Sequence, residues 1–327
     1  MSDLLSTITQ IVKYGRNTNS YKFALLRALI RQAPHTDPNN PQIATRALAE
    51  EFVALYWPIE VTFRLRQGSD PDKDPIVMKE IRKLISSKKI PSGISHSDFK
   101  RRHHKAWDHL CSVVEQKAFR DVIPRFHMLR KQAANKALYR YTLNSVKKGG
   151  SIELTPEGRY LLINQASTLD LVAVQGWARF TESFSSSPKL TSKLSGEPPT
   201  RKPLSKWLPA LSKMQSNKCF YCEGQIRSKP HIDHFLPWSF VFEDKAWNLV
   251  MCCKICNLQK SDQLPSELYL RKILLRNRNL LSTRVHKETN AFFRDFSEWH
   301  TRDMNGHINL LYDQAKNNDF PLWKGIK

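Results

Sequence analysis

Five of the six cysteines lie close together in the chain, and four of them form two Cys-x-x-Cys pairs, Cys219/Cys222 and Cys253/Cys256. Four thiolates at this spacing are the ligand set of a closed tetrahedral structural zinc site. If Cys252 replaced Cys253, the two-residue spacing to Cys256 would be lost, so we expect Cys252 to be a small packed residue. The sequence therefore predicts a structural zinc ion held by Cys219, Cys222, Cys253 and Cys256.

A second, chemically different group of residues lies between and just after the two cysteine pairs. His231, Asp233 and His234 stand between the pairs, and Asn257 follows the last cysteine directly. Carboxylate, carboxamide and imidazole groups suit a hard divalent ion and a general base better than a structural zinc ion. We assign His234 as the general base, because a neutral imidazole accepts a proton near pH 7.

Together these residues resemble the HNH endonuclease family in its zinc-knuckle, ββα-metal form. The family pattern is Cys-x-x-Cys, then Asp-His followed by a proline, then Asn-Leu, then Cys-x-x-Cys-Asn and a lysine. The resemblance covers about residue 204 to about residue 280, and its specificity comes from the combination of motifs in order. The matching residues are Cys219–Cys222, Asp233-His234 with Pro237, Asn248-Leu249, Cys253–Cys256-Asn257 and Lys260.

The resemblance implies a fold, a reaction and an ion. We expect a ββα-metal fold that hydrolyses DNA phosphodiester bonds and leaves 5′-phosphate and 3′-hydroxyl ends. It implies that Asp233 and Asn257 bind a catalytic Mg²⁺ or Mn²⁺ ion, which needs few protein ligands because it keeps waters and substrate oxygens. The zinc ion is expected to stabilise the module and to take no part in the cleavage.

Three further residues receive roles at this stage. By family analogy, Asn248 fixes the loop that leads out of the hairpin and so supports His234 indirectly. Lys260 lies three residues beyond Asn257 and is expected to contact a phosphate. His231 is two residues before Asp233, so on a strand both side chains face the same way. It is either a third metal ligand or an orienting group, and the sequence leaves this open.

The chain is strongly basic, since its 52 Lys and Arg exceed its 30 Asp and Glu by 22 over 327 residues. Such an excess favours a polyanionic partner, because each neutralised phosphate releases counterions. We expect DNA rather than RNA as this partner. Two local runs are candidates for phosphate contact, although a solvated face is the alternative in each case. They are Lys100, Arg101, Arg102 and Lys105 in one run, and Lys147 and Lys148 in the other.

The sequence also bears on the compartment. Clustered cysteines indicate metal ligation in a reducing compartment rather than a disulfide framework. No apolar run approaches the ~18 residues of a membrane span, and the first residues lack the pattern of a signal peptide. We therefore expect a cytoplasmic protein with no membrane partner.

Apolar periodicity predicts a mainly α protein with a small α+β module at the C-terminal end. We expect helices over 3–14, from Ser20 to Ile30, from Leu48 to Trp57, and over 76–88, 97–119, 167–184 and 204–214, with others after Pro265 and near 288–300 and 305–317. Alternating residues over 138–154 predict a β-hairpin. The expected domains are 1–186 (helical, binding nucleic acid or a partner), 187–203 (linker), 204–285 (HNH nuclease) and 286–327 (helical extension).

The sequence thus favours a metal-dependent HNH endonuclease, and the family context suggests restriction or anti-phage defence. Two alternatives stay open. One is a nicking or RNA-directed nuclease subunit of a larger effector complex, and the other is a non-catalytic, zinc-stabilised nucleic-acid-binding protein. One HNH centre cuts one strand, so double-strand cleavage would require a homodimer or sequential nicks, and a defence-complex partner is equally compatible with the sequence.

Overall fold

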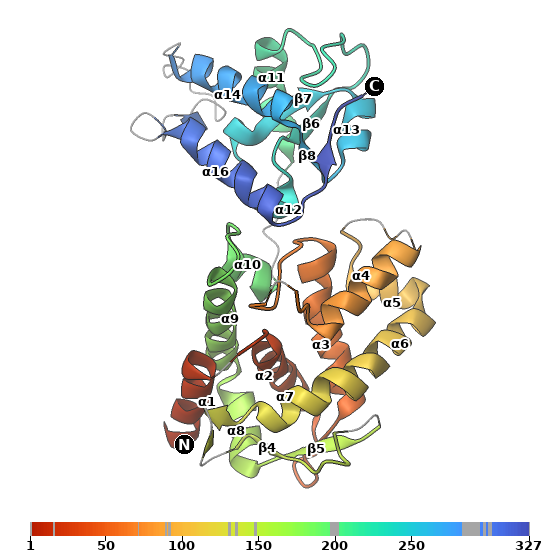
Figure 1. Cartoon of the computed structure of the whole chain (residues 1–327), viewed down its shortest axis with the longest axis vertical. Coiled ribbons are helices and arrows are strands. Elements are labelled where there is room, and N and C mark those ends of the chain that lie inside the picture. The colour runs from red at the N-terminus through yellow and green to blue at the C-terminus, as the bar shows by residue number, and fades with distance from the viewer. Residues whose placement is uncertain are drawn as a thin grey trace. The chain divides into compact units, whose positions relative to one another are not determined.

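The computed structural model is mainly helical and divides into two compact units, as Figure 1 shows. The first unit is Met1–Ser185 with Leu190–Glu197, and the second is Ser186–Lys189 with Pro198–Lys327. No helix within the described residues is long and apolar enough to cross a membrane. The described residues are 2–15, 17–70, 72–88, 90, 93–129, 132–134, 137–146, 149–196, 203–282, 295–296, 299 and 303–326.

The first unit is a helical domain built around one central helix. Every residue from Tyr21 to Ile30 in this helix, α2, is buried, and it packs against α9 and α3 (Figure 1). The helices are α1 (Ser2–Tyr14), α2 (Tyr21–Gln32), η1 (Ala33–His35), α3 (Thr45–Val61), α4 (Ile76–Lys88), α5 (His96–Arg102), α6 (His104–Val113), the π-helical turn η2 (Val114–Ala118), α7 (Phe119–Arg125), α8 (Pro156–Asn164), α9 (Ala166–Glu182) and α10 (Leu190–Ser195).

The buried guanidinium of Arg27 in α2 explains a helix that the sequence did not predict. Arg27 is 3% exposed and forms an ion pair with Asp170 of α9 at 2.6 Å. Its remaining N–H groups donate to the carbonyl oxygens of Leu194 and Ser195 at the end of α10. These bonds satisfy both the buried guanidinium and the helix end. Residues 190–195, which we expected to be linker, are therefore helical and part of the first unit.

The prediction that the third helix ends near Trp57-Pro58 is wrong. Helix α3 continues through Pro58 to Val61. A proline inside a helix costs about 3 kcal/mol because a backbone hydrogen bond is lost. Here Trp57, Ile59 and Val61 are all buried, and burying three large apolar side chains contributes more than the proline costs.

The single helix expected over 97–119 is broken. The chain leaves helical geometry at His103, with φ −134° and ψ 46°, so that α5 and α6 are separate helices. This break lets Phe99 and Trp107 both pack on Trp57, at ring distances of 4.4 and 6.1 Å. Tertiary packing of aromatic rings therefore decides the local structure, and the helical periodicity of the sequence does not reveal it.

The predicted hairpin over 138–154 is present. Strands β4 (Tyr139–Arg140) and β5 (Ser151–Leu154) pair antiparallel, with Tyr139 opposite Leu154. Strand β1 (Gln42–Ala44) adds to the other side of β5. A further short pair joins β2 (Met128–Leu129) to β3 (Gln132–Ala133). Lys147 and Lys148, expected at the tip of the hairpin, lie outside the described residues.

The second unit contains the small α+β module. Its elements are η3 (Leu204–Trp207), α11 (Leu208–Met214), β6 (His231–His234), α12 (Trp238–Val241), η4 (Ala246–Asn248), β7 (Leu249–Cys252), α13 (Lys254–Lys260), β8 (Leu264–Pro265), α14 (Glu267–Ser282), α16 (Met304–Asn317) and β9 (Leu322–Trp323). Helices α11, α14 and α16 match the predicted ones. Most of the helix expected over 288–300 lies outside the described residues.

The last part of the chain shares the hydrophobic core of the small α+β module. Strand β9 pairs in parallel with β8, and Tyr312 of α16 donates a hydrogen bond to the carbonyl oxygen of Pro265 at 2.7 Å. Ile308, Leu311 and Trp323 are buried in one cluster with residues of β6, β7 and α13. Residues 303–326 thus pack into the same hydrophobic core and do not form a separate layer of their own.

Candidate active site and zinc site

A short antiparallel hairpin and one helix carry the predicted site residues. Strand β6 pairs with β7, so that His231 lies opposite Cys252 and His234 lies opposite Leu249. Helix α13 begins two residues after β7, and the Cys253 thiol accepts the backbone N–H of Cys256 at its first turn. This β–β–α order is the arrangement that the resemblance predicted.

The four predicted zinc ligands come together at one point. The Sγ atoms of Cys219, Cys222, Cys253 and Cys256 all lie within 4.8 Å of one another, and those of Cys222 and Cys253 are 4.0 Å apart. Tetrahedral zinc with Zn–S bonds of ≈ 2.3 Å separates its sulfurs by roughly 3.8 Å. The cluster therefore fits a zinc ion. Cys252 is separate from it, fully buried, with its thiol pKa raised by burial.

Asp233 is a buried carboxylate with two strong donors. The Tyr221 hydroxyl lies 2.5 Å from its Oδ2, and the Lys260 ammonium lies 3.0 Å from the same oxygen. Burial and the nearby Asp233 carboxylate raise the pKa of Tyr221 well above its usual value, so this phenol is a proton donor. The described residues provide no hydrogen bond to the other oxygen, Oδ1.

Asn257 of α13 contacts His231 of β6. The Asn257 amide nitrogen lies 3.5 Å from His231 Nδ1, and His231 is on the same strand face as Asp233. Asn257 directs its amide nitrogen at His231, and no described residue donates to its amide oxygen. Asp233 and Asn257 thus each have an oxygen to which no described residue donates, and carboxylate and amide oxygens are ligand types that suit a hard divalent ion such as Mg²⁺.

His234 points away from Asp233 and toward a residue that the sequence did not single out. Its Nε2 lies 2.8 Å from Oδ1 of Asp244. Asp244 follows Phe242, which adopts a left-handed conformation (φ 58°) at the end of α12. That conformation is strained for a bulky residue, so packing must hold it; Phe242 is buried against Trp238, with ring centroids 4.6 Å apart.

Asn248 braces the loop that follows the first strand. Its side chain accepts the N–H of Leu236 at 2.7 Å and donates to the carbonyl oxygen of the same residue at 3.0 Å. Arg276 of α14 donates to the carbonyl oxygens of Trp247 and Leu249, on both sides of Asn248. These bonds satisfy the buried polar groups around Asn248 and tie its side chain to the loop after β6.

Lys260 is placed differently from the expectation. Its side chain is 1% exposed, and its ammonium donates to the carbonyl oxygen of His234 at 2.8 Å as well as to Asp233. A group this buried is not presented to an incoming phosphate. The ammonium instead joins the side chain of Asp233 to the backbone of the next residue, and it neutralises a buried carboxylate.

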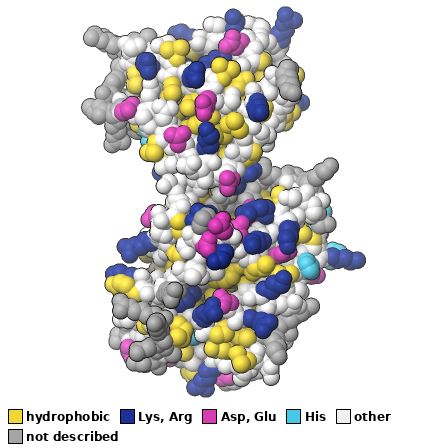
Figure 2. Space-filling view, in the orientation of Figure 1, with side chains coloured by type: hydrophobic (Ala, Val, Ile, Leu, Met, Phe, Trp, Pro, Cys, Tyr) yellow, Lys and Arg dark blue, Asp and Glu magenta, His cyan; other side chains and the backbone are white. Residues whose placement is uncertain are grey.

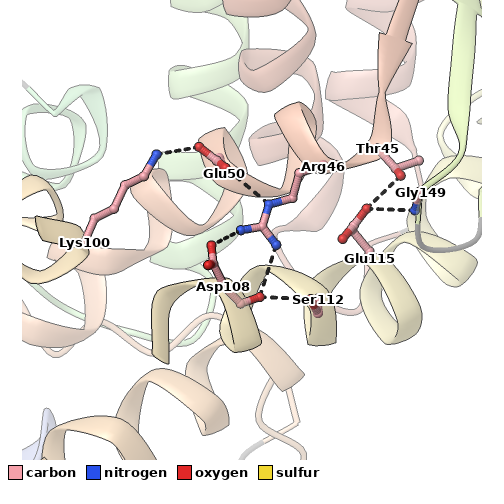
Figure 3. Close-up of polar contacts among 8 residues, drawn as sticks. All are labelled: Thr45, Arg46, Glu50, Lys100, Asp108, Ser112, Glu115 and Gly149. Atoms are coloured by element: carbon pink, nitrogen blue, oxygen red, sulfur yellow. Dashed lines mark hydrogen bonds and ion pairs between the residues drawn. The ribbon is translucent and has the colours of Figure 1, made fainter. Parts of the chain in front are cut away.

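Two residues of the predicted basic run in the first unit have protein partners. Lys100 contacts Glu50 at 2.7 Å and Arg101 contacts Asp98 at 2.7 Å, whereas Arg102 and Lys105 form no ion pair with any described residue. Figure 3 shows Lys100 with Glu50 in a network that also includes Arg46 and Asp108. In the second unit, Lys272 contacts Glu223 at 2.7 Å and so forms part of the packed module.

Sequence reasoning missed Asp244 and Tyr221. Asp244 reaches His234 only because of the turn at Phe242, and an isolated Asp in a loop carries no pattern that shows this. Tyr221 is one of the two residues between the first pair of cysteines, and nothing in its spacing predicts a bond to Asp233. Both contacts depend on tertiary structure.

Comparison with known protein families agrees with this geometry. Residues 219–266 match a family model described as HNH endonuclease. This part of the chain is therefore an HNH endonuclease module, and such modules act on nucleic acids. Residues 1–195 match a second family model, described as a domain of unknown function (DUF8808).

The second match covers more than half of the chain, which accordingly belongs to the DUF8808 family. Searches of curated proteins and of solved structures gave no significant match.

Proposed function

We propose that this protein is a metal-dependent endonuclease that hydrolyses DNA phosphodiester bonds. The observation that carries the proposal is that one small β–β–α module carries a cysteine cluster, the Asp233 carboxylate, the Asn257 amide and His234. A purely structural zinc knuckle does not need a buried carboxylate and an amide with oxygens left open beside it.

Three residues of the module would have separate roles in the reaction. Asp233 and Asn257 would hold a Mg²⁺ or Mn²⁺ ion, which supplies charge stabilisation at the scissile phosphate and at the leaving 3′ oxygen. His234 takes the proton of the attacking water through Nδ1, because Nε2 is engaged with Asp244. The products are a 5′-phosphate and a 3′-hydroxyl end.

Asp244 has a defined part in this scheme as a positioning residue. A carboxylate accepts from N–H and so selects the tautomer in which Nε2 carries the proton and Nδ1 is the free base. It also holds the ring in one orientation and stabilises the imidazolium that forms when the proton is taken. The same division of labour between a base and its orienting carboxylate recurs on unrelated folds.

A restriction or anti-phage defence role is proposed on the family context alone. A nicking enzyme is the second candidate, because each chain carries one HNH module and one such centre cuts one strand. The two candidates differ only in whether one strand or both strands of the duplex are cut.

The test is incubation of supercoiled plasmid with the full chain and Mg²⁺, beside EDTA and beside His234→Ala. We expect loss of supercoiled DNA only with wild-type protein and Mg²⁺. Linear product identifies paired cuts, and open circle identifies nicking. If the plasmid stays supercoiled with every divalent ion tried, the proposal is contradicted. The non-catalytic nucleic-acid-binding protein is then the remaining alternative.

A further inference from the structure

The first unit has a rod-like segment made of three consecutive helical pieces. Helix α6, the π-helical turn η2 and α7 follow one another without an intervening loop from His104 to Arg125. One side of this segment is buried, with Trp107, Leu110, Val114, Phe119 and Ile123 all in the core. Its opposite side carries exposed residues near both ends, and Ser112 and Val113 between them are partly exposed.

Exposed polar side chains recur along the other side, and some of them are basic. Lys105, His109, Gln116 and Arg120 are all exposed and lie at i, i+4, i+11 and i+15, which repeats close to the helical period. Lys117 is exposed beside Gln116. We call Lys105, Lys117 and Arg120, the three permanent cations of this side, the basic stripe. Figure 2 shows Lys, Arg and His side chains gathered on the face of the first unit that α6 and α7 present.

The cations of the basic stripe are not neutralised by neighbouring carboxylates. None of the three forms an ion pair with a residue that the structure describes. The nearby acidic residues are engaged elsewhere: Asp108 pairs with Arg46 (Figure 3), and Asp121 pairs with Arg125. Glu115 is buried on the opposite side, where it accepts the Thr45 hydroxyl at 2.8 Å. The stripe therefore presents net positive charge to solvent.

The dimensions of the stripe match a nucleic-acid backbone. Fifteen residues at about 1.5 Å per residue extend about 20 Å. Successive phosphates of one DNA strand rise 3.4 Å along the duplex and also wind around it, so a segment of this length can reach a few of them. A helical ridge with lysine and arginine along it can lie against phosphates without reading bases.

We infer that the basic stripe of α6–η2–α7 is a docking surface for the phosphate backbone of duplex DNA, which the first unit holds while the HNH module acts. The choice of DNA as the polyanion rests on the proposed function, whereas the existence of the surface rests on the charges themselves. The run that sequence reasoning favoured is thus only partly used, because Lys100 and Arg101 are ion-paired and the surface continues to Lys117 and Arg120.

The test measures binding without cleavage. The full chain carrying His234→Ala, with its zinc and without added Mg²⁺ or Mn²⁺, is titrated into a fluorescent 20-base-pair duplex at several salt concentrations, and log K is plotted against log salt. The test variant adds Lys105→Gln, Lys117→Gln and Arg120→Gln. The matched control adds Lys13→Gln, Lys79→Gln and Arg179→Gln, which removes three exposed cations of the same unit from other helices.

Each phosphate contact contributes about −0.9 to the slope of that plot. We expect the test variant to lose about 3 from the magnitude of the slope and the control to keep the parent slope. An unchanged slope in the test variant, an equal loss in both variants, or a parent chain that does not bind the duplex overturns the inference. This measurement does not depend on catalysis. If the chain binds with the expected slope but never cuts plasmid, the proposed nuclease activity is refuted and the docking surface is still supported.

Discussion

Nε2 of His234 lies 2.8 Å from Oδ1 of Asp244, which is ten residues further along the chain. The loop between them is shaped by the left-handed Phe242 and by the two hydrogen bonds that Asn248 makes to Leu236. A base and its orienting carboxylate are therefore brought together by a short, internally braced loop, and the sequence alone gives no sign of this pairing.

Replacing Asp244 should show whether this residue orients the His234 imidazole or only stabilises the fold. We expect Asp244→Ala to lower kcat about 100-fold with little change in KM, because the base loses its fixed tautomer and substrate contacts remain. Asp244→Asn should be at least as damaging, since its amide can donate to Nε2 and hold the wrong tautomer. If Asp244 had only a structural role, Asp244→Asn would have nearly wild-type activity. Steady-state kinetics on a labelled duplex distinguish the positioning role from the structural role.

The cysteine cluster makes a second prediction. Cys256→Ser should lose zinc and unfold the second unit, because a four-thiolate site contributes on the order of 10 kcal/mol of apparent folding free energy. Cys252→Ala is the matched control, since Cys252 is buried next to the cluster but is not part of it. Metal analysis and circular dichroism report the outcome. Loss of zinc from Cys252→Ala would show that the ligand set is misassigned.

Lys260 allows a choice between two roles. If its ammonium holds Asp233, Lys260→Met should destabilise the second unit by about 3–5 kcal/mol, because it leaves a buried carboxylate without a counter-ion, and it should reduce kcat. If Lys260 instead contacts substrate, the same change raises KM and weakens the salt dependence of binding while stability is kept. Denaturant unfolding and kinetics on one preparation distinguish these outcomes, and the geometry predicts the first.

The zinc ligands and the Asp-His pair could be predicted from the sequence because a ligand knuckle is a local pattern with fixed spacing. The contacts of Asp233 could not, since Tyr221 and Lys260 reach it through the packing of three separate segments. The first unit shows the same limit. The hydrophobic period located α2 and α9, but the break at His103 and the passage of α3 through Pro58 depend on burial around Trp57.

A pH prediction follows from His127 in the first unit. Its Nε2 accepts the N–H of Leu138 at 2.9 Å, and burial, with a smaller contribution from Lys22, lowers its pKa to about 4. The unfolded chain has a histidine pKa near 6.5, so between these values only the unfolded state binds the proton. Stability is therefore complete above about pH 6.5 and falls as the pH drops toward 4, by up to about 3 kcal/mol.

The measurement for His127 compares urea unfolding of the wild-type chain and of His127→Gln, which keeps an acceptor, from pH 5 to 7. We expect the wild-type free energy of unfolding to fall more steeply with decreasing pH than that of the variant. Parallel curves would mean that folding does not lower the pKa of His127.

The most direct test of the account is single-turnover cleavage of an end-labelled duplex by saturating enzyme in Mg²⁺. The account predicts that wild-type protein releases fragments with 5′-phosphate and 3′-hydroxyl ends. His234→Ala should bind the duplex equally well, keep its zinc and cut at least 100-fold more slowly, since general base catalysis contributes about 10²–10⁴-fold. Equal cleavage rates for the folded, zinc-loaded variant and the wild type would contradict the assignment of His234 as the general base of this nuclease.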